Sequence, residues 1–210
     1  MITLVIIGVI AAITVPTLMN KTQNQEYVSK LKKTYSTLAQ ATNLIIAEEG
    51  TPKNGWATSS ENIYNLYKKH LNRAKECGKE QNCWGVGPYK LLNGSTYDDY
   101  YTIDSWRANY QKLVLADGTS IMFDSNAFSS CTGDWDGTPA EDCTIIWVDV
   151  NGAKKPNQFG RDTFVFILKE NGLSPSGCVK ANRTMGNYNC NLYNGRGCAC
   201  KVLREGAMNY

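Results

Sequence analysis

Eight cysteines are the residues of this 210-residue chain with the clearest chemical potential. All of them lie after residue 76, and the chain has a single histidine, His70, so zinc sites that mix cysteine with histidine are nearly excluded. An even number at short spacings is typical of disulfides formed in an oxidising compartment. Reduced thiols, or an all-cysteine zinc site in the last quarter of the chain, are the alternatives. The cysteines are Cys77, Cys83, Cys131, Cys143, Cys178, Cys190, Cys198 and Cys200.

The spacing of the cysteines suggests part of the pairing and leaves the rest open. Two local disulfides are expected, Cys77–Cys83 and Cys131–Cys143, with the last four cysteines paired among themselves. Cys198 and Cys200 are not expected to pair with each other, because one intervening residue would force a strained ring.

Calcium is the one cofactor that the side chains suggest. Asp149, Asn151 and Asp162, together with Asp134 and Asp136, offer oxygen ligands in loops beside predicted strands. Carboxylate and amide oxygens are what Ca²⁺ prefers, although this spacing does not match an EF-hand loop. The alternative is turn formation, since Asp and Asn before Gly are common turn residues.

The sequence contains no catalytic constellation. It has no supported Ser-His-Asp set, and no cysteine lies beside a plausible histidine. The short Gly85-Val-Gly87 and Gly195-Arg-Gly197 stretches lack the strand-to-helix context of a phosphate-binding loop. The net charge is only +3, and no basic run exceeds two residues. We therefore expect neither an enzyme nor a nucleic-acid-binding protein.

An uncharged N-terminal segment dominates the elements that must carry these residues. Residues 1–19 contain no charge, and as a helix they would rise roughly 28 Å, about the thickness of a bilayer core. A cleavable secretory signal is the rival interpretation, but it would need a basic start and a small-x-small cleavage site. We expect residues 1–20 to form a transmembrane or filament-core helix half. Its predicted contact residues are Leu4, Ile7, Gly8, Ile10, Ala11 and Pro16.

Residues 21–49 continue the same helix with amphipathic character. Apolar side chains recur at helical spacing from Tyr27 through Leu31, Leu38 and Leu44 to Ile45. The helix is expected to end before Gly50 and Pro52. A helix of about 48 residues is roughly four times the ordinary globular length, so its own domain cannot bury it.

Residues 50–210 are predicted to form one globular head. A second helix is expected over about 59–75, and strands are expected in a hairpin over 113–123 and at 143–150 and 163–168. Short links imply an antiparallel sheet of about four strands, and residues 78–110 and 176–210 are expected to be irregular. The predicted fold is therefore α+β, with a long N-terminal helix packed on an antiparallel sheet with disulfide-stapled loops.

The stretch Gly-Val-Ile-Ala-Ala-Ile-Thr-Val-Pro, which ends at Pro16, resembles the N-terminal helix of type IV pilin-like proteins, including the pseudopilins of type II secretion. The head is similar to heads in the same group at short motifs that together with the helix cover about half the chain. These motifs are Leu115–Gly118, Val148–Gly152, Pro156-Asn157, Gly160–Asp162 and Met208–Tyr210.

The resemblance implies a filament subunit. In the family, the apolar helix halves pack in the filament core, the heads form the outer surface, and the subunit waits in the inner membrane before assembly. Some pseudopilin heads bind calcium near the sheet, so the resemblance also favours calcium here.

The beginning of the chain departs from the family pattern. Members have a basic leader, a glycine cleavage site and an early glutamate, whereas here Met1 aligns about six residues inside the mature helix and the first acidic residue is Glu26. We expect that the chain as given is not a substrate for the prepilin peptidase, and that the native protein starts further upstream. The lysines after the apolar span would hold the head in the cytoplasm, against the indication from the cysteines, and a basic leader would resolve this conflict.

We therefore expect a structural subunit of a bacterial type IV pilus-like filament or type II secretion pseudopilus. Its partners would be copies of itself or other pilins, the inner membrane and the assembly machinery. It would cross the inner membrane once with its head outside the cytoplasm, and then enter a surface or periplasmic filament. The alternative is a membrane-anchored adhesin, a minor pilin-like module that recognises a surface or a glycan.

Overall fold

A computed structural model gives the fold of the chain. It describes residues 2–80, 83–85, 87–96, 110–124, 131–133, 141–178, 190 and 195–210. Within residues 2–17 it describes the backbone, with the side chain of Thr14 alone.

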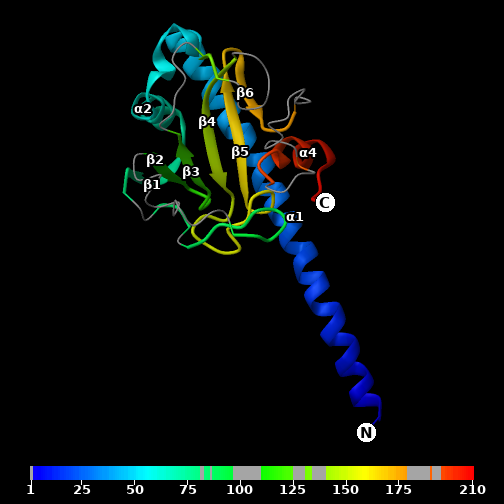
Figure 1. Cartoon of the computed structure of the whole chain (residues 1–210). Helices are drawn as coiled ribbons and strands as arrows, with labels where there is room; N and C mark the ends of the chain where they lie inside the picture. Colours follow the sequence, from blue (N-terminus) through cyan, green and yellow to red (C-terminus); the bar gives the residue numbers. More distant parts are fainter. Residues whose placement is uncertain are drawn as a thin grey trace.

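One helix, α1 (Ile2–Glu49), runs for 48 residues through the head and beyond it (Figure 1). Gly50 ends it as predicted: this glycine has a φ of +82°, and its N–H donates to the carbonyl of Ile46 at 3.0 Å. A left-handed residue after the last turn satisfies a helix carbonyl and turns the chain away. The expected continuous helix is therefore confirmed.

The C-terminal part of α1 buries one stripe against the head. Leu31, Leu38 and Ile45 are fully buried, as the helical spacing predicted. Leu44 was expected in this stripe, but half of its surface is exposed (50%), because it lies about 100° around the helix from Ile45. Thr42 is buried in the stripe instead, and its hydroxyl shares a 2.5 Å hydrogen bond with the hydroxyl of Tyr67.

The sheet is a six-stranded antiparallel meander in which the strands lie in sequence order. The expected hairpin and the next two expected strands are all present. The strands are β1 (Arg73–Gly78), β2 (Gln111–Leu115), β3 (Ser120–Phe123), β4 (Asp142–Asp149), β5 (Thr163–Lys169) and β6 (Gly172–Pro175).

The two strands that the sequence did not predict are the edge strands β1 and β6. β1 reads Arg-Ala-Lys-Glu-Cys-Gly and is mostly exposed, so it has no apolar alternation to reveal it. It takes the residues expected at the end of the second helix, so α2 (Ser60–His70) is shorter than predicted. A further helix, α4 (Cys198–Glu205), lies in the segment predicted to be irregular.

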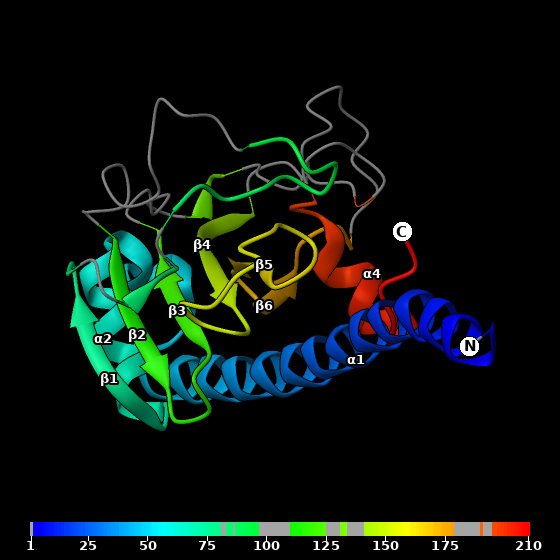
Figure 2. The ribbon, with the colours of Figure 1, turned by 90° about the horizontal axis from the view of Figure 1, so that it is seen from below.

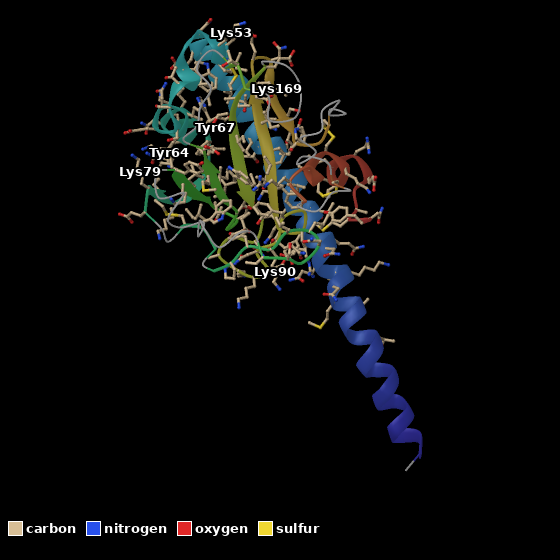
Figure 3. All side chains as sticks on the ribbon, viewed as in Figure 1. Lys53, Tyr64, Tyr67, Lys79, Lys90 and Lys169 are labelled. Atoms are coloured by element: carbon tan, nitrogen blue, oxygen red, sulfur yellow. A yellow bond between two sulfur atoms is a disulfide. The ribbon has the colours of Figure 1, made fainter. Side chains whose placement is uncertain are left out.

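Both faces of the central strands are buried. Successive side chains of a strand point to opposite sides of the sheet, and in β3, β4 and β5 those on both sides are buried. On the first face, Ile146, Val148 and Phe166 pack with α1, α2 and α4, and Tyr35 of α1 stacks on Phe166 at 5.5 Å. Figure 2 shows α1 running along this face, and Figure 3 shows Tyr64 and Tyr67 on α2.

A second, aromatic core covers the opposite face. Ile145, Trp147 and Val165 of the sheet pack there with side chains from the connecting segments. These are Trp84, Tyr89, Tyr110 and Phe159. The uninterrupted apolar run of β4 therefore reflects burial on both sides.

All eight cysteines form disulfides. The two local pairs are Cys77–Cys83 and Cys131–Cys143, as their spacing suggested, and the last four cysteines pair among themselves as Cys178–Cys200 and Cys190–Cys198. Disulfides of this number indicate an extracytoplasmic protein.

Among the residues that the structure describes, no helix combines enough length with enough apolar character to cross a bilayer.

Two leucines of α1, Leu31 and Leu44, give a direct test of this packing. Leu31→Ala should lower the free energy of unfolding by about 3 kcal/mol, because it leaves a cavity in the core. Leu44→Ala, on the exposed face of the same helix, should cost about 0.5 kcal/mol or less. Urea unfolding of the detergent-solubilised full chain measures both, and equal losses would contradict the packed stripe.

Candidate functional site

The predicted calcium ligands meet at the end of the sheet where β4 leads into β5. Asp149 is the last residue of β4, Asn151 follows in the turn, and Asp162 directly precedes β5. This end of the head lies beside α1 as the helix leaves the head (Figure 1). We call Asp149, Asn151 and Asp162 the aspartate clamp.

Asp149 is buried and accepts hydrogen bonds at both carboxylate oxygens. Its Oδ1 accepts from the backbone N–H of Asn151 at 3.2 Å. Its Oδ2 accepts from the hydroxyl of Tyr89 at 3.0 Å and from that of Thr163 at 3.5 Å. Asp149 therefore joins the turn after β4 to the segment that carries Tyr89.

Asp162 closes the loop between β4 and β5. Its Oδ1 accepts from the N–H of Gln158 at 2.5 Å, and its Oδ2 from the N–H of Asn157 at 2.8 Å. Asp162 is fully buried, so these bonds replace its lost hydration.

Asn151 connects the clamp to the long helix. Its Nδ2 lies 3.1 Å from Oδ2 of Asp162, 3.0 Å from the carbonyl oxygen of Lys155 and 3.0 Å from the hydroxyl of Tyr27 on α1. One amide group thus ties the loop to itself and to the helix.

Burial sets the electrostatics of the clamp. Desolvation, followed by the nearby charge of Asp162, raises the pKa of Asp149 well above its ordinary value. Desolvation also raises the pKa of Asp162, against the lowering effect of the hydrogen bonds from Gln158 and Asn157. The carboxyl groups of Asp149 and Asp162 are thus both buried, and they lie close enough that the charge of Asp162 affects the pKa of Asp149.

In the structure the carboxylates of the clamp act as hydrogen-bond acceptors, and calcium binding by these residues stays a prediction. Calcium takes six to eight oxygen ligands, as a general rule. Here all four carboxylate oxygens accept hydrogen bonds, and the nearby amide oxygens of Asn151 and Asn157 are buried with no donor among the described residues. No group of three acidic, histidine or cysteine side chains that could hold a metal occurs among the described residues.

The other two predicted ligands, Asp134 and Asp136, lie outside the described residues. The backbone is helical at the predicted contact residues of the N-terminal helix half, but their side chains are likewise not described. These residues are Leu4, Ile7, Gly8, Ile10, Ala11 and Pro16. Their role as contact residues remains a prediction.

The sequence did not identify the partners of the clamp. Tyr89 lies 60 residues before Asp149, and Tyr27 lies 124 residues before Asn151. No local pattern connects positions so far apart, and only the meander and the course of α1 bring them together.

The single histidine and three tryptophans lie at contacts within the fold. His70 lies 3.2 Å from a carboxylate oxygen of Glu48 on α1, at the junction of two helices. Trp56, Trp84 and Trp147 are buried in the two cores.

No known family model, curated protein or solved structure matches this chain. The clamp and the fold therefore have to be interpreted from the residues of the chain itself.

Calcium binding can be tested directly on stability. The melting temperature of the full chain should be the same in excess calcium and in excess EGTA, because hydrogen-bond donors already satisfy the carboxylates. Differential scanning fluorimetry measures this. An increase of several degrees with calcium that is absent in Asp162→Asn would restore the calcium interpretation.

The raised pKa of Asp149 predicts a pH dependence of defined sign. A carboxyl whose pKa is higher in the folded than in the unfolded state contributes stability that is present below the unfolded pKa and is lost as the pH rises through the folded pKa. The stability of the wild type relative to Asp149→Asn should therefore fall between pH 5 and pH 8. Urea midpoints at the two pH values measure this difference.

Asp117 provides the matched control. Burial opposes ionisation of this residue, but hydrogen bonds from Lys33 and Thr119 leave its pKa below the ordinary value. It is ionised throughout this pH range, so the difference between the wild type and Asp117→Asn should stay constant. A constant difference for Asp149→Asn as well would contradict the assigned direction.

Proposed function

We propose that this chain is a structural subunit of a type IV pilus-like filament or a type II secretion pseudopilus, assembled through its apolar N-terminal helix half. The observation that carries the proposal is the course of α1. The head packs on its C-terminal part, and its N-terminal part continues beyond the head (Figure 1).

The exposure of α1 changes where the helix enters the head. Leu18 and Met19, at the end of the uncharged segment, are 66% and 67% exposed, whereas Tyr27 and Leu31 are buried. Apolar surface of this kind gains free energy by leaving water, and the head does not supply the cover at Leu18 and Met19. Lipid before assembly and neighbouring copies after assembly would supply it.

The shape favours an open assembly over a closed one. A helix that projects from one end of a head can pack along the same helices of copies staggered along an axis. Such a contact joins two different surfaces, so it propagates as a helical filament unless the rotation closes a ring. The partners under this proposal are copies of the chain or other pilins, the inner membrane and the assembly machinery.

The remaining support comes from the compartment and from the sequence. Four disulfides fit a head that matures outside the reducing cytoplasm. The Gly8–Pro16 motif resembles the family helix. The adhesin alternative would need an exposed aromatic surface, and the three tryptophans that the structure describes are buried.

A charge in the uncharged segment should abolish assembly. Ile10→Glu would bury a carboxylate without a partner in the filament core, so filaments sheared from cells that make this variant should be absent from electron micrographs. The variant should still form its disulfides, because the head is unchanged. The matched control is Asn65→Glu, which adds the same charge on the exposed face of α2 and should leave filaments intact.

The same preparation identifies the filament. Mass spectrometry of the wild-type filaments should find peptides from residues 59–210, and N-terminal peptides should show where the native chain begins. The proposed function would be refuted if filaments from wild-type cells lacked these peptides, or if no filaments formed. It would also be refuted if the Ile10→Glu variant made normal filaments.

A further inference from the structure

A small pocket lies at the neck, where α1 leaves the head. It encloses about 320 Å³ and is formed by α1, the loop before β5 and the C-terminal residues. Its walls include Asn24, Leu92, Gln158, Arg161, Met208 and Tyr210. We call it the neck pocket.

Arg161 is the charged residue in the wall of the neck pocket. Its Nη2 donates to two neutral acceptors on α1, Oδ1 of Asn20 at 3.4 Å and Oε1 of Gln23 at 3.2 Å. Its Nε is buried and has no hydrogen-bond partner among the described residues. The guanidinium carries a positive charge into the wall of the pocket, and its planar set of N–H donors suits the oxygens of an anion.

The position of the pocket along α1 indicates the source of that anion. Met19 is the last residue of the uncharged segment, and Asn20 and Asn24 lie about 1.5 Å and 7.5 Å further along the helix axis. The head-group layer on each side of a bilayer is about 5–7 Å thick. When residues 1–19 lie in the hydrocarbon core, the neck pocket is level with the lipid phosphates.

The lining of the pocket suits this interface. Tyr210 is 43% exposed, and its hydroxyl donates to the carbonyl oxygen of Gly160. Tyrosine is enriched at membrane–water interfaces because its ring is apolar and its hydroxyl is polar. Leu92 and Met208 add apolar surface beside it.

Further positive charge surrounds the neck. Lys21, Lys154 and Lys155 are exposed, as is Lys90, which Figure 3 shows at the end of the head where α1 leaves. The N–H of Lys90 donates to the carbonyl oxygen of Asn157 at 2.9 Å, so it belongs to the same group of loops. Basic residues next to a membrane segment attract anionic lipids.

We propose that the neck pocket binds the phosphate of an anionic phospholipid, with Arg161 as its main ligand, while the subunit waits in the membrane. This inference rests on the membrane stage of the proposed function. It adds a specific lipid site that would hold the head at a fixed height above the bilayer.

Native mass spectrometry of the full chain in detergent tests the site, with phosphatidylglycerol and phosphatidylcholine as the added lipids. The wild type should retain phosphatidylglycerol in preference to phosphatidylcholine, and Arg161→Gln should bind phosphatidylglycerol about tenfold more weakly. Arg161→Lys keeps the charge and should be intermediate. The matched control is Lys53→Gln, which removes a positive charge at the opposite end of the head (Figure 3) and should bind like the wild type.

The outcomes separate the lipid site from its alternatives. Equal binding of the two lipids by the wild type, or equal losses in Arg161→Gln and Lys53→Gln, would overturn the proposal. Full competition by inorganic phosphate alone would identify a free-phosphate site and would also overturn it. The melting temperature of Arg161→Gln without lipid shows whether this variant folds. If it does not fold, the preference of the wild type for phosphatidylglycerol over phosphatidylcholine still tests the proposal.

The proposed function is tested by a different measurement. If filaments are seen in electron micrographs but the wild type shows no preference for phosphatidylglycerol, only the lipid site is refuted. If the wild type prefers phosphatidylglycerol but no filaments form, only the assembly role is refuted.

Discussion

The packing of one stripe of α1 against the first face of the sheet is the interaction on which the rest of the structure depends. It joins Leu31, Leu38 and Ile45 of the helix to Ile146 and Phe166 of the two longest strands. Because a helix can offer only one apolar stripe to one surface, this contact covers α1 from about Tyr27 to Ile45 and no further. Leu18 and Met19, before this stripe, are exposed.

The aspartate clamp extends this contact to the end of the sheet. Asp149 and Asp162 tie down the loop between β4 and β5, and Asn151 joins that loop to Tyr27 of α1. The cost of burying two carboxyls is offset by the hydrogen bonds that each accepts. The result fixes the loop at the place where the helix leaves the head, and the same loop supplies Arg161 to the neck pocket.

A firmly attached helix and a stapled head suit the proposed filament subunit. Self-assembly through one end of a long helix transmits position along the fibre only if the head cannot pivot on that helix. The stripe, the clamp and the contact of Arg161 with Gln23 all oppose such a pivot, since each joins the head to a different turn of α1. The disulfides cross-link the segments that flank the strands and α4, which restricts the unfolded chain.

The sequence by itself determined the elements whose signal is local. The length of α1, its end at Gly50, the Asp117-Gly118 hairpin and the central strands follow from periodicity and turn residues. The α+β class and the two short-range disulfides follow from the same kind of pattern. The sequence could also predict that Asp149, Asn151 and Asp162 lie close together at one edge of the sheet, because each flanks a predicted strand.

Only the tertiary structure decided the features that depend on distant contacts. The edge strand β1 has no apolar alternation, and it forms because β2 offers it an unpaired edge. Tyr89 and Tyr27 meet the clamp because the chain folds back over 60 and 124 residues. The hydrogen-bond donors around these aspartates were likewise open in the sequence, because a carboxylate takes its partners from the groups that the fold places around it.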